Sequence, residues 1–414
     1  MRLSPLVWFV LAPLACVRAD DESDQRSTIN EATLEAHIKL LASDELEGRA
    51  AGFPGNERAV DYIVDQVKGY GLAPAGDKGG YTQEFTFKGD RKAKNVCAVL
   101  EGSDPKLKAE FVGIGCHLDH VGMEGQAVGG QSPGGPDKIW NGADDNASGT
   151  SAVLAIARAF AKAKTRPKRS LLFCWWNAEE AGLLGSKHWV KNPTRPLDKI
   201  TYYLNLDMVG RNPERPMDME GVKNAEGDRL EKIIGAACEA EGLKISKFDH
   251  SNEAMFRSDG ANFLEQGIAA SMMFTSWHAD YHRSGDHWDK IAYPNLAKIA
   301  RAAHRIVGET AGLDVALKFN VDTPLRGKAL RIRGEDLDGG KVKVTDVLDG
   351  PLAAAGLKAG DVIVSLGGTP LPAVRPLASL WMRVQFQVRF DEAVEVGILR
   401  GGAAQTLKAV WPRK

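Results

Sequence analysis

The sequence is poor in cysteine and has no excess of either charge. Its 414 residues include five cysteines, and the formal net charge is -1. Five cysteines spread over this length do not resemble a disulfide framework, so we expect buried thiols. Balanced charge without a basic bias argues against nucleic acid as a partner. What remains is a globular protein whose apolar content of 43% can fill a core.

Long apolar runs are also missing, except for a short one near the N-terminus. No other stretch is long enough to cross a membrane, so the sequence predicts no membrane span. Residues 1–19 have the pattern of an export signal, in which Arg2 precedes a short apolar core. We therefore expect an exported protein, periplasmic or extracellular. Lipoprotein processing at Cys16 is the less favoured alternative, because Pro13 suits that signal poorly.

Strand-like and helical patterns alternate over the first three quarters of the chain. Strands are expected at 95–100, 110–115, 171–176, 202–208 and 268–274. Helices are expected at 31–41, from 54, at 147–163, from 180, at 228–241 and at 296–312. This alternation predicts an α/β fold, with a mainly parallel sheet covered on both faces. Beyond a boundary at 313–322, the pattern changes to short strands with glycine turns, at 341–347, 361–366 and 393–399.

The stretch 117–149 contains the first candidate site. His117 and Asp119 follow an apolar run, and their alternation in extended chain places both side chains on one face. A neutral imidazole there can bind a metal while a carboxylate fixes its tautomer. Asp144 and Asp145 stand together in a turn of small residues, where adjacent carboxylates require a cation to offset their repulsion. Taken alone, the first pair is equally well explained as a structural histidine and its partner.

Three further polar clusters follow predicted strands. Glu179 and Glu180 stand where a strand meets a helix, which suits one metal ligand beside one proton acceptor. The same pair also suits the first turn of a helix through its dipole. Asp207 ends an apolar strand as either a ligand or a hydrogen-bond anchor, and three histidines share the stretch 278–287. Histidines and carboxylates gathered after successive strands suit zinc with an open position for water.

Taken in order, these motifs resemble those of the secreted bacterial zinc aminopeptidases. The resemblance covers about residues 30–312, and its motifs read H-L-D, A-D-D-N-A-S-G, W-N-A-E-E, N-L-D-M-V-G and D-Y-H-x-x-x-D. The larger group includes glutamate carboxypeptidase, glutaminyl cyclase and the transferrin receptor. The resemblance implies a three-layer α/β/α zinc-exopeptidase fold with a mostly parallel mixed central sheet. It also implies aminopeptidase activity on peptide substrates and two zinc ions per chain.

The resemblance assigns the metal ligands in two overlapping sets. One zinc would be held by His117, Asp145 and Asp207, and the other by Asp145, Glu180 and His282. Asp145 would therefore bridge the two ions. Related enzymes have a cis peptide bond after the bridging aspartate, so one is expected between Asp145 and Asn146.

The resemblance also assigns roles around the metals. Glu179 would be the general base, and Asp119 and Asp286 would orient the two histidine ligands. Tyr281 matches a position that helps to polarise the scissile carbonyl in some members. Arg257, in the run F-R-S-D, matches an arginine that contacts substrate in some members.

The C-terminal part resembles a PDZ domain of the bacterial protease kind, on the pattern of 344–368. Such domains usually take up a peptide C-terminus as an added strand. The stretch that matches the carboxylate-binding loop is 328–332, but Arg331 replaces a common glycine and Ala329 a common bulky apolar residue. Binding of a peptide C-terminus and a docking domain without a ligand therefore both stay open.

The sequence thus predicts three parts, namely a signal peptide at 1–19, a zinc peptidase domain at 20–312 and a PDZ-like domain at 323–414. Three alternatives to an aminopeptidase stay open: a carboxypeptidase-type enzyme, a glutaminyl-cyclase-type enzyme with one zinc, and a non-catalytic receptor-like module. The complete set of candidate ligands and base argues against the last of these. The sequence does not indicate the preferred N-terminal residue, the natural substrate or the oligomeric state.

Overall fold

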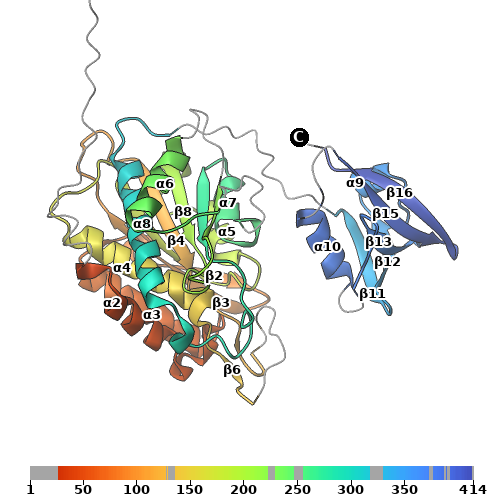
Figure 1. The fold of residues 1–414 in the computed structure, drawn as a ribbon, viewed down its shortest axis with the longest axis horizontal. Helices are drawn as coiled ribbons and strands as arrows, with labels where there is room; N and C mark the ends of the chain where they lie inside the picture. The colour runs from red at the N-terminus through yellow and green to blue at the C-terminus, as the bar shows by residue number, and fades with distance from the viewer. Residues whose placement is uncertain are drawn as a thin grey trace, which may run out of the picture.

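The computed structural model describes residues 27–126, 128, 136–221, 229–246, 255–317, 330–372, 376–386, 388 and 392–412. Within them the chain forms an eight-stranded sheet and a six-stranded sheet, each with its own hydrophobic core, and a small two-stranded sheet (Figure 1). The expected export signal lies outside the described residues. Among the described helices, none is long and apolar enough to cross a membrane.

The eight-stranded sheet is parallel at its centre and antiparallel at its edges. Its strands run in the order β1-β3-β7-β4-β8-β10-β9, with β2 paired to β3. The strands are β1 (Ala73–Pro74), β2 (Thr82–Phe87), β3 (Arg91–Leu100), β4 (Phe111–His117), β7 (Ser170–Trp176), β8 (Ile200–Leu206), β9 (Asp218–Gly221) and β10 (Ala270–Phe274). The strands β7, β4, β8 and β10 are parallel neighbours. Every residue of β4 and β7 is buried, which explains their unbroken apolar sequences.

Helices cover both faces of this sheet, so the expected three-layer α/β/α fold is confirmed (Figure 1). One layer contains α2 (Glu31–Leu41), α3 (Pro54–Gly69), α4 (Gly149–Lys162), α6 (Arg229–Ala240) and α8 (Tyr293–Gly312). The other contains α5 (Leu184–Lys191) and α7 (Gly260–Leu264), which pack against each other. Local sequence explains several helix starts: Asn30 accepts a hydrogen bond from Thr33 N–H at 2.9 Å, and Pro54 occupies the first turn of α3.

Two helices begin later than expected, and three strands of the eight-stranded sheet, β1, β2 and β9, were not expected. The helix expected from Glu180 begins at Leu184, because Ala178 and Leu183 adopt left-handed backbone conformations. The helix expected from Ala147 begins at Gly149, after a tight turn over Ala143–Ser148. The strands β2 and β9 lack the apolar runs that revealed the central strands, since they lie towards the sheet edges. The described cysteines are buried free thiols, as expected.

The six-stranded sheet forms the C-terminal part and is antiparallel throughout, in the order β11-β12-β13-β15-β16 with β14 paired to β13. Its strands are β11 (Ile332–Leu337), β12 (Lys341–Val347), β13 (Val362–Leu366), β14 (Thr369–Pro370), β15 (Ala393–Arg400) and β16 (Ala403–Val410). Two helices accompany them, α9 (Pro351–Ala354) and α10 (Pro376–Phe386). The three strands expected here are confirmed. The residues 318–329, which include the second half of the expected domain boundary, lie outside the described part.

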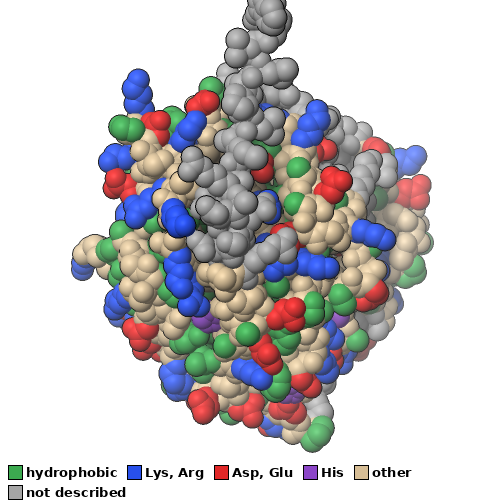
Figure 2. Space-filling view, turned by 60° about the vertical axis from the view of Figure 1, so that its left-hand side comes forward, with side chains coloured by type: hydrophobic (Ala, Val, Ile, Leu, Met, Phe, Trp, Pro, Cys, Tyr) green, Lys and Arg blue, Asp and Glu red, His purple; other side chains and the backbone are tan. Residues whose placement is uncertain are grey.

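One face of the molecule shows how the two charge signs are distributed. Over the face drawn in Figure 2, Lys and Arg side chains are interspersed with Asp and Glu side chains. This matches the formal net charge of -1.

Candidate metal centre

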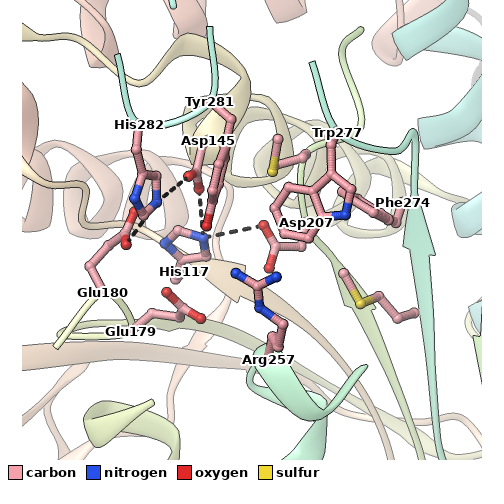
Figure 3. A pocket seen from close by; sticks show the side chains of 12 residues that line it. His117, Asp145, Glu179, Glu180, Asp207, Arg257, Phe274, Trp277, Tyr281 and His282 are labelled. Carbon is pink, nitrogen blue, oxygen red and sulfur yellow. Dashed lines mark hydrogen bonds and ion pairs between the residues drawn. The ribbon is translucent and has the colours of Figure 1, made fainter. Parts of the chain in front are cut away.

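The candidate site lies at the carboxyl ends of the parallel strands. His117 is the last residue of β4, and Asp207 directly follows β8 on one side of it. Glu179 and Glu180 follow β7 on the other side. The carboxyl edge of an open α/β sheet is where such folds usually bind ligands, because loops from neighbouring strands converge there. Side chains from segments far apart in sequence therefore meet in one pocket (Figure 3).

The first donor set consists of His117, Asp145 and Asp207. The Nε2 atom of His117 lies 3.2 Å from an oxygen of Asp145 and 3.2 Å from an oxygen of Asp207. All three side chains are almost completely buried. Donors of a tetrahedral zinc site with bonds of about 2.0–2.1 Å are roughly 3.3 Å apart. The observed spacing therefore fits three ligands of one zinc ion.

The second donor set contains the other oxygen of Asp145. The Nε2 atom of His282 lies 3.1 Å from Oδ2 of Asp145 and 3.1 Å from Oε2 of Glu180. That nitrogen faces both carboxylates, so it is placed to bind the same metal ion as they do. The two oxygens of Asp145 face different histidines, as Figure 3 shows, and this is the arrangement that a bridging ligand needs.

His120 joins the second set, although the sequence analysis did not select it. Its Nδ1 lies 3.0 Å from Oε1 of Glu180 and 3.7 Å from Oδ2 of Asp145. Its ring meets that of His282 edge-on, with centroids 5.6 Å apart. The second group able to hold a metal is therefore His120, Asp145, Glu180 and His282. The only local signal was its position directly after Asp119, and that signal does not distinguish a site residue from a neighbour.

Asp119 and Asp286 both support loops that carry candidate ligands. The main-chain oxygen of Asp119 lies 3.1 Å from Nδ1 of His117, closer than its carboxylate oxygen at 3.8 Å. Its carboxylate accepts hydrogen bonds from the N–H groups of Glu179 and Glu180, at 3.1 and 3.3 Å. Asp286 accepts from the N–H group of Asp145 at 3.1 Å and from that of the preceding residue at 2.9 Å.

The loop that carries Asp145 is tightly constrained. The expected cis peptide bond between Asp145 and Asn146 is present. The Asn146 side chain donates to the Leu206 carbonyl at 3.0 Å, which ties the loop to the end of β8. Gly142 has a φ of +59°, and a Cβ there would lie 2.4 Å from the His120 ring. Only glycine therefore allows this close approach.

Glu179, Arg257 and Tyr281 line the same pocket as the two donor sets (Figure 3). The Tyr281 ring stacks on that of His282 with centroids 3.9 Å apart, and the Arg257 guanidinium lies 4.6 Å over the Trp277 ring. The five proposed ligands thus line one pocket with Glu179, Arg257 and Tyr281, whereas Asp286 bonds to the main chain of the Asp145 loop. The rest of the wall is apolar and consists of Met208, Met272, Phe274 and Trp277.

Burial and neighbouring charges act in opposite directions on these carboxyl groups. Burial opposes ionisation of Asp145, but hydrogen bonds from His117 and His282 outweigh it and hold its pKa well below the ordinary range. Burial raises the pKa of Glu179 well above its ordinary value, and the neighbouring Glu180 charge adds to this effect. Hydrogen bonds therefore favour the charged form of Asp145, whereas burial makes Glu179 more basic than an ordinary glutamate.

The sheet and the two donor sets together have the architecture of a zinc exopeptidase. Residues 95–307 match the model of peptidase family M28, and residues 325–380 match that of the PDZ domain. The chain belongs to peptidase family M28, with a PDZ domain after the peptidase part.

Known relatives cover most of the peptidase part. Leupeptin-inactivating enzyme 1 of Streptomyces exfoliatus is 30% identical over 306 residues, which are 70% of this chain and 59% of that protein. An aminopeptidase of Pseudomonas aeruginosa is 33% identical over 189 residues, 44% of this chain and 31% of that protein. This chain therefore spans less than two thirds of the length of these curated relatives.

A solved structure shares the fold. The LapA aminopeptidase of Legionella pneumophila superposes with a TM-score of 0.54 at 20% identity, over 73% of this chain and 78% of that chain. At this identity the likeness concerns the fold alone.

Proposed function

We propose that this chain is an exported zinc aminopeptidase that removes N-terminal residues from peptides. One observation supports this most directly: Asp145 directs one carboxylate oxygen to each of two histidines, at 3.2 and 3.1 Å. Such a carboxylate, buried between two donor sets at tetrahedral spacing, suits a pair of zinc ions. Membership of family M28 and the aminopeptidases among its relatives support the same activity.

In this proposal His117, Asp145 and Asp207 would hold one zinc, and Asp145, Glu180 and His282 would hold the other. Bound zinc would supply Lewis acidity, polarising the substrate carbonyl and making water more acidic. The support loops then act as an outer shell. The Asp119 carboxylate fixes the main chain at Glu179 and Glu180, while Asp286 fixes it at Asp145.

Glu179 is the general base. Its carboxylate takes a proton from the attacking water while the water oxygen forms a bond to the scissile carbonyl carbon. The same carboxyl group then gives the proton to the leaving nitrogen, and the peptide C–N bond breaks. A raised pKa suits both transfers, because the group has to hold the proton between them. Tyr281 donates towards the carbonyl oxygen, and Arg257 contacts the substrate main chain.

The apolar wall favours an apolar first residue. Met208, Met272 and Phe274 line the pocket beside the donor sets, and the Trp277 ring completes the wall next to Arg257. Burying an apolar side chain there removes its surface from water, which favours binding by about 25 cal/mol per Å². Substrates that begin with an apolar residue should therefore be cleaved faster than those that begin with a charged one.

A substrate panel tests the activity. Aminoacyl amides and peptides with free N-termini should be hydrolysed, whereas N-blocked peptides should resist and C-blocked peptides should not. The opposite pattern would indicate a carboxypeptidase. Cyclisation of N-terminal glutamine, with one metal per chain, would indicate a glutaminyl-cyclase-type enzyme. A metal-loaded chain that turns over none of these substrates would contradict the proposal and favour a receptor-like module.

We also infer that residues 1–19 direct export, that residues 20–312 form the peptidase domain and that residues 323–414 form a PDZ domain that binds a peptide C-terminus. Arg331 has a φ of +54°, a left-handed conformation that favours glycine, and its carbonyl accepts from the N–H group of Leu348 at 2.8 Å. The main chain at this point therefore has the geometry expected where glycine is common. Titration of the domain with free-acid and amidated peptides tests the proposal, since only free acids should bind.

A further inference from the structure

Arg49 is a buried cation behind the metal centre, in a loop that the proposed function does not use. It ends the 3-10 turn η1 (Asp44–Arg49) and is 1% exposed. Its guanidinium donates hydrogen bonds to four main-chain carbonyls: Nε to Leu118 at 3.0 Å, Nη1 to Leu41 at 2.5 Å and Asn141 at 2.7 Å, and Nη2 to Gly142 at 2.8 Å. The described residues place no carboxylate in ion-pair contact with it.

Three of these carbonyls belong to segments that carry the candidate ligands. Leu118 lies directly after His117 in the chain, and Gly142 lies three residues before Asp145. One guanidinium therefore connects the end of β4 to the loop of the bridging residue. The spacing between these two segments sets the 3.2 Å approach of His117 to Asp145.

The main chain of Arg49 extends the same support to His120 and to the Glu179 loop. Its carbonyl accepts from the N–H group of His120 at 3.2 Å and from the side chain of Asn56 at 3.0 Å. Asn56 in turn forms a reciprocal amide pair with Asn177, at 2.9 and 3.1 Å, just before Glu179. Apart from the end of α2 at Leu41 and the start of α3 at Asn56, the segments that this network reaches carry side chains of the candidate site.

The charge of Arg49 suits its position. Burial lowers its pKa to about 10, while the nearby carboxylates, of which Asp145 and Asp119 have the largest effects, favour its charged form. A buried cation without a direct counter-ion is costly unless surrounding charges offset it. Here the site carboxylates supply that offset. Because Arg49 bonds to carbonyls alone, it leaves the carboxylate oxygens of the proposed ligands available to a metal.

We propose that Arg49 is a positioning residue for the metal centre, holding the segments of His117, His120 and Asp145 at the spacing that zinc requires. The inference rests on the proposed metal-binding function. Arginine suits the task because its planar group presents five donors in a fixed arrangement. Lysine at this position would keep the charge but could not reach four carbonyls with one fixed geometry.

The test compares Arg49→Met and Arg49→Lys with Arg169→Met in the full chain. Arg169 is an equally buried arginine at the opposite end of the sheet, where it contacts Glu110 at 2.7 Å. Three readouts are needed: zinc affinity by chelator competition, the visible absorption spectrum of the cobalt-loaded protein, and urea unfolding of the metal-free protein. Zinc affinity should fall about ten- to hundredfold in Arg49→Met and less in Arg49→Lys. The cobalt spectrum should change in both, whereas Arg169→Met should lower stability alone.

Each outcome decides the matter. Wild-type zinc affinity and cobalt spectrum in a folded Arg49→Met protein would overturn the proposal, as would an equal loss of affinity in Arg169→Met. If Arg49→Met does not fold, Arg49→Lys decides, and an unchanged spectrum and affinity in that variant would overturn the proposal. A wild-type chain that binds no zinc would instead overturn the proposed function itself.

Discussion

The two ends of the central sheet treat buried charge in different ways. At the amino end, Arg169 contacts Glu110 at 2.7 Å, and the Ser170 hydroxyl donates to the Lys108 carbonyl at 2.7 Å. The charge of Arg169 and the hydroxyl of Ser170 are therefore both paired with groups of the protein itself. At the carboxyl end, buried carboxylates gather around histidines, and the buried Arg49 contacts carbonyls instead of carboxylates. The comparison indicates that the amino end is built for stability, while the carboxyl end keeps negative charge available for a cation.

Removing the metal should produce the largest effect on hydrolysis, and it should affect only the carboxyl end of the sheet. Chelation should abolish hydrolysis. The site of Asp145, Asp207 and Glu180 would then lack the positive charge of the metal, which polarises the substrate carbonyl and makes water more acidic. We expect about two zinc ions per chain before chelation, by elemental analysis, and recovery of activity on adding zinc. Far-UV circular dichroism should show that the sheet persists. Full activity in a metal-free preparation would contradict the proposed centre.

Glu179 and Glu180, which are neighbours at the carboxyl end of the sheet, should respond differently to substitution. Glu179→Gln should lower turnover ~10²–10⁴-fold while zinc content stays normal, because this residue is proposed as a base and not as a ligand. Glu180→Gln is the matched control and should lower zinc content. Turnover and elemental analysis on the same preparations separate the two effects. If Glu179→Gln loses zinc and Glu180→Gln keeps it, the two roles are reversed.

At the amino end, the expected effect is on stability alone. Arg169→Met should lower the free energy of unfolding by about 1–3 kcal/mol, since it leaves hydrogen-bond acceptors without their donor. The value is at the low end for a buried pair because Glu110 is one-third exposed. Urea unfolding measures the change. Turnover per folded molecule should stay at the wild-type value, and a marked fall in turnover would remove the contrast between the two ends.

A buried histidine in the helical layer should make stability depend on pH. His304 stacks on Phe160 with centroids 3.8 Å apart, and burial, with a smaller effect of Arg305, lowers its pKa to about 3. Below pH 6.5 the unfolded chain takes up a proton that the folded chain refuses, so stability falls as the pH falls towards 3. This single group would contribute about 1.4 kcal/mol per pH unit. In urea unfolding between pH 7 and 4, His304→Gln should show a weaker pH dependence than the wild type.

Removing the C-terminal domain should have the smallest effect on hydrolysis. Every proposed ligand lies before residue 313, and the two sheets have separate cores. The chain ending at residue 312 should therefore fold and cleave a short aminoacyl amide at the wild-type rate. Circular dichroism and turnover of the truncated protein check this. A folded but inactive truncation would show that the C-terminal part completes the active site.

Local sequence patterns were sufficient to predict the central strands and to select the candidate ligands. The run Phe111–Gly115 predicted a strand because buried parallel strands are apolar on both faces. Polar residues that directly follow such runs, such as His117 and Asp207, stood out against them. The edge strand β2 was missed because its alternating residues include polar ones, as expected for a strand with one exposed face.

What the sequence by itself determined is which residue types follow each strand, and hence the α/β class and the motifs shared with a family of zinc peptidases. Only the tertiary structure decided which partners meet. His120 and Glu180 are 60 residues apart in the chain, and Arg49 and Gly142 are 93 apart. Neither contact has a local pattern, because strand order and loop packing create it. The sequence therefore reveals groups that can bind a metal, while the contacts that position them depend on the assembled sheet.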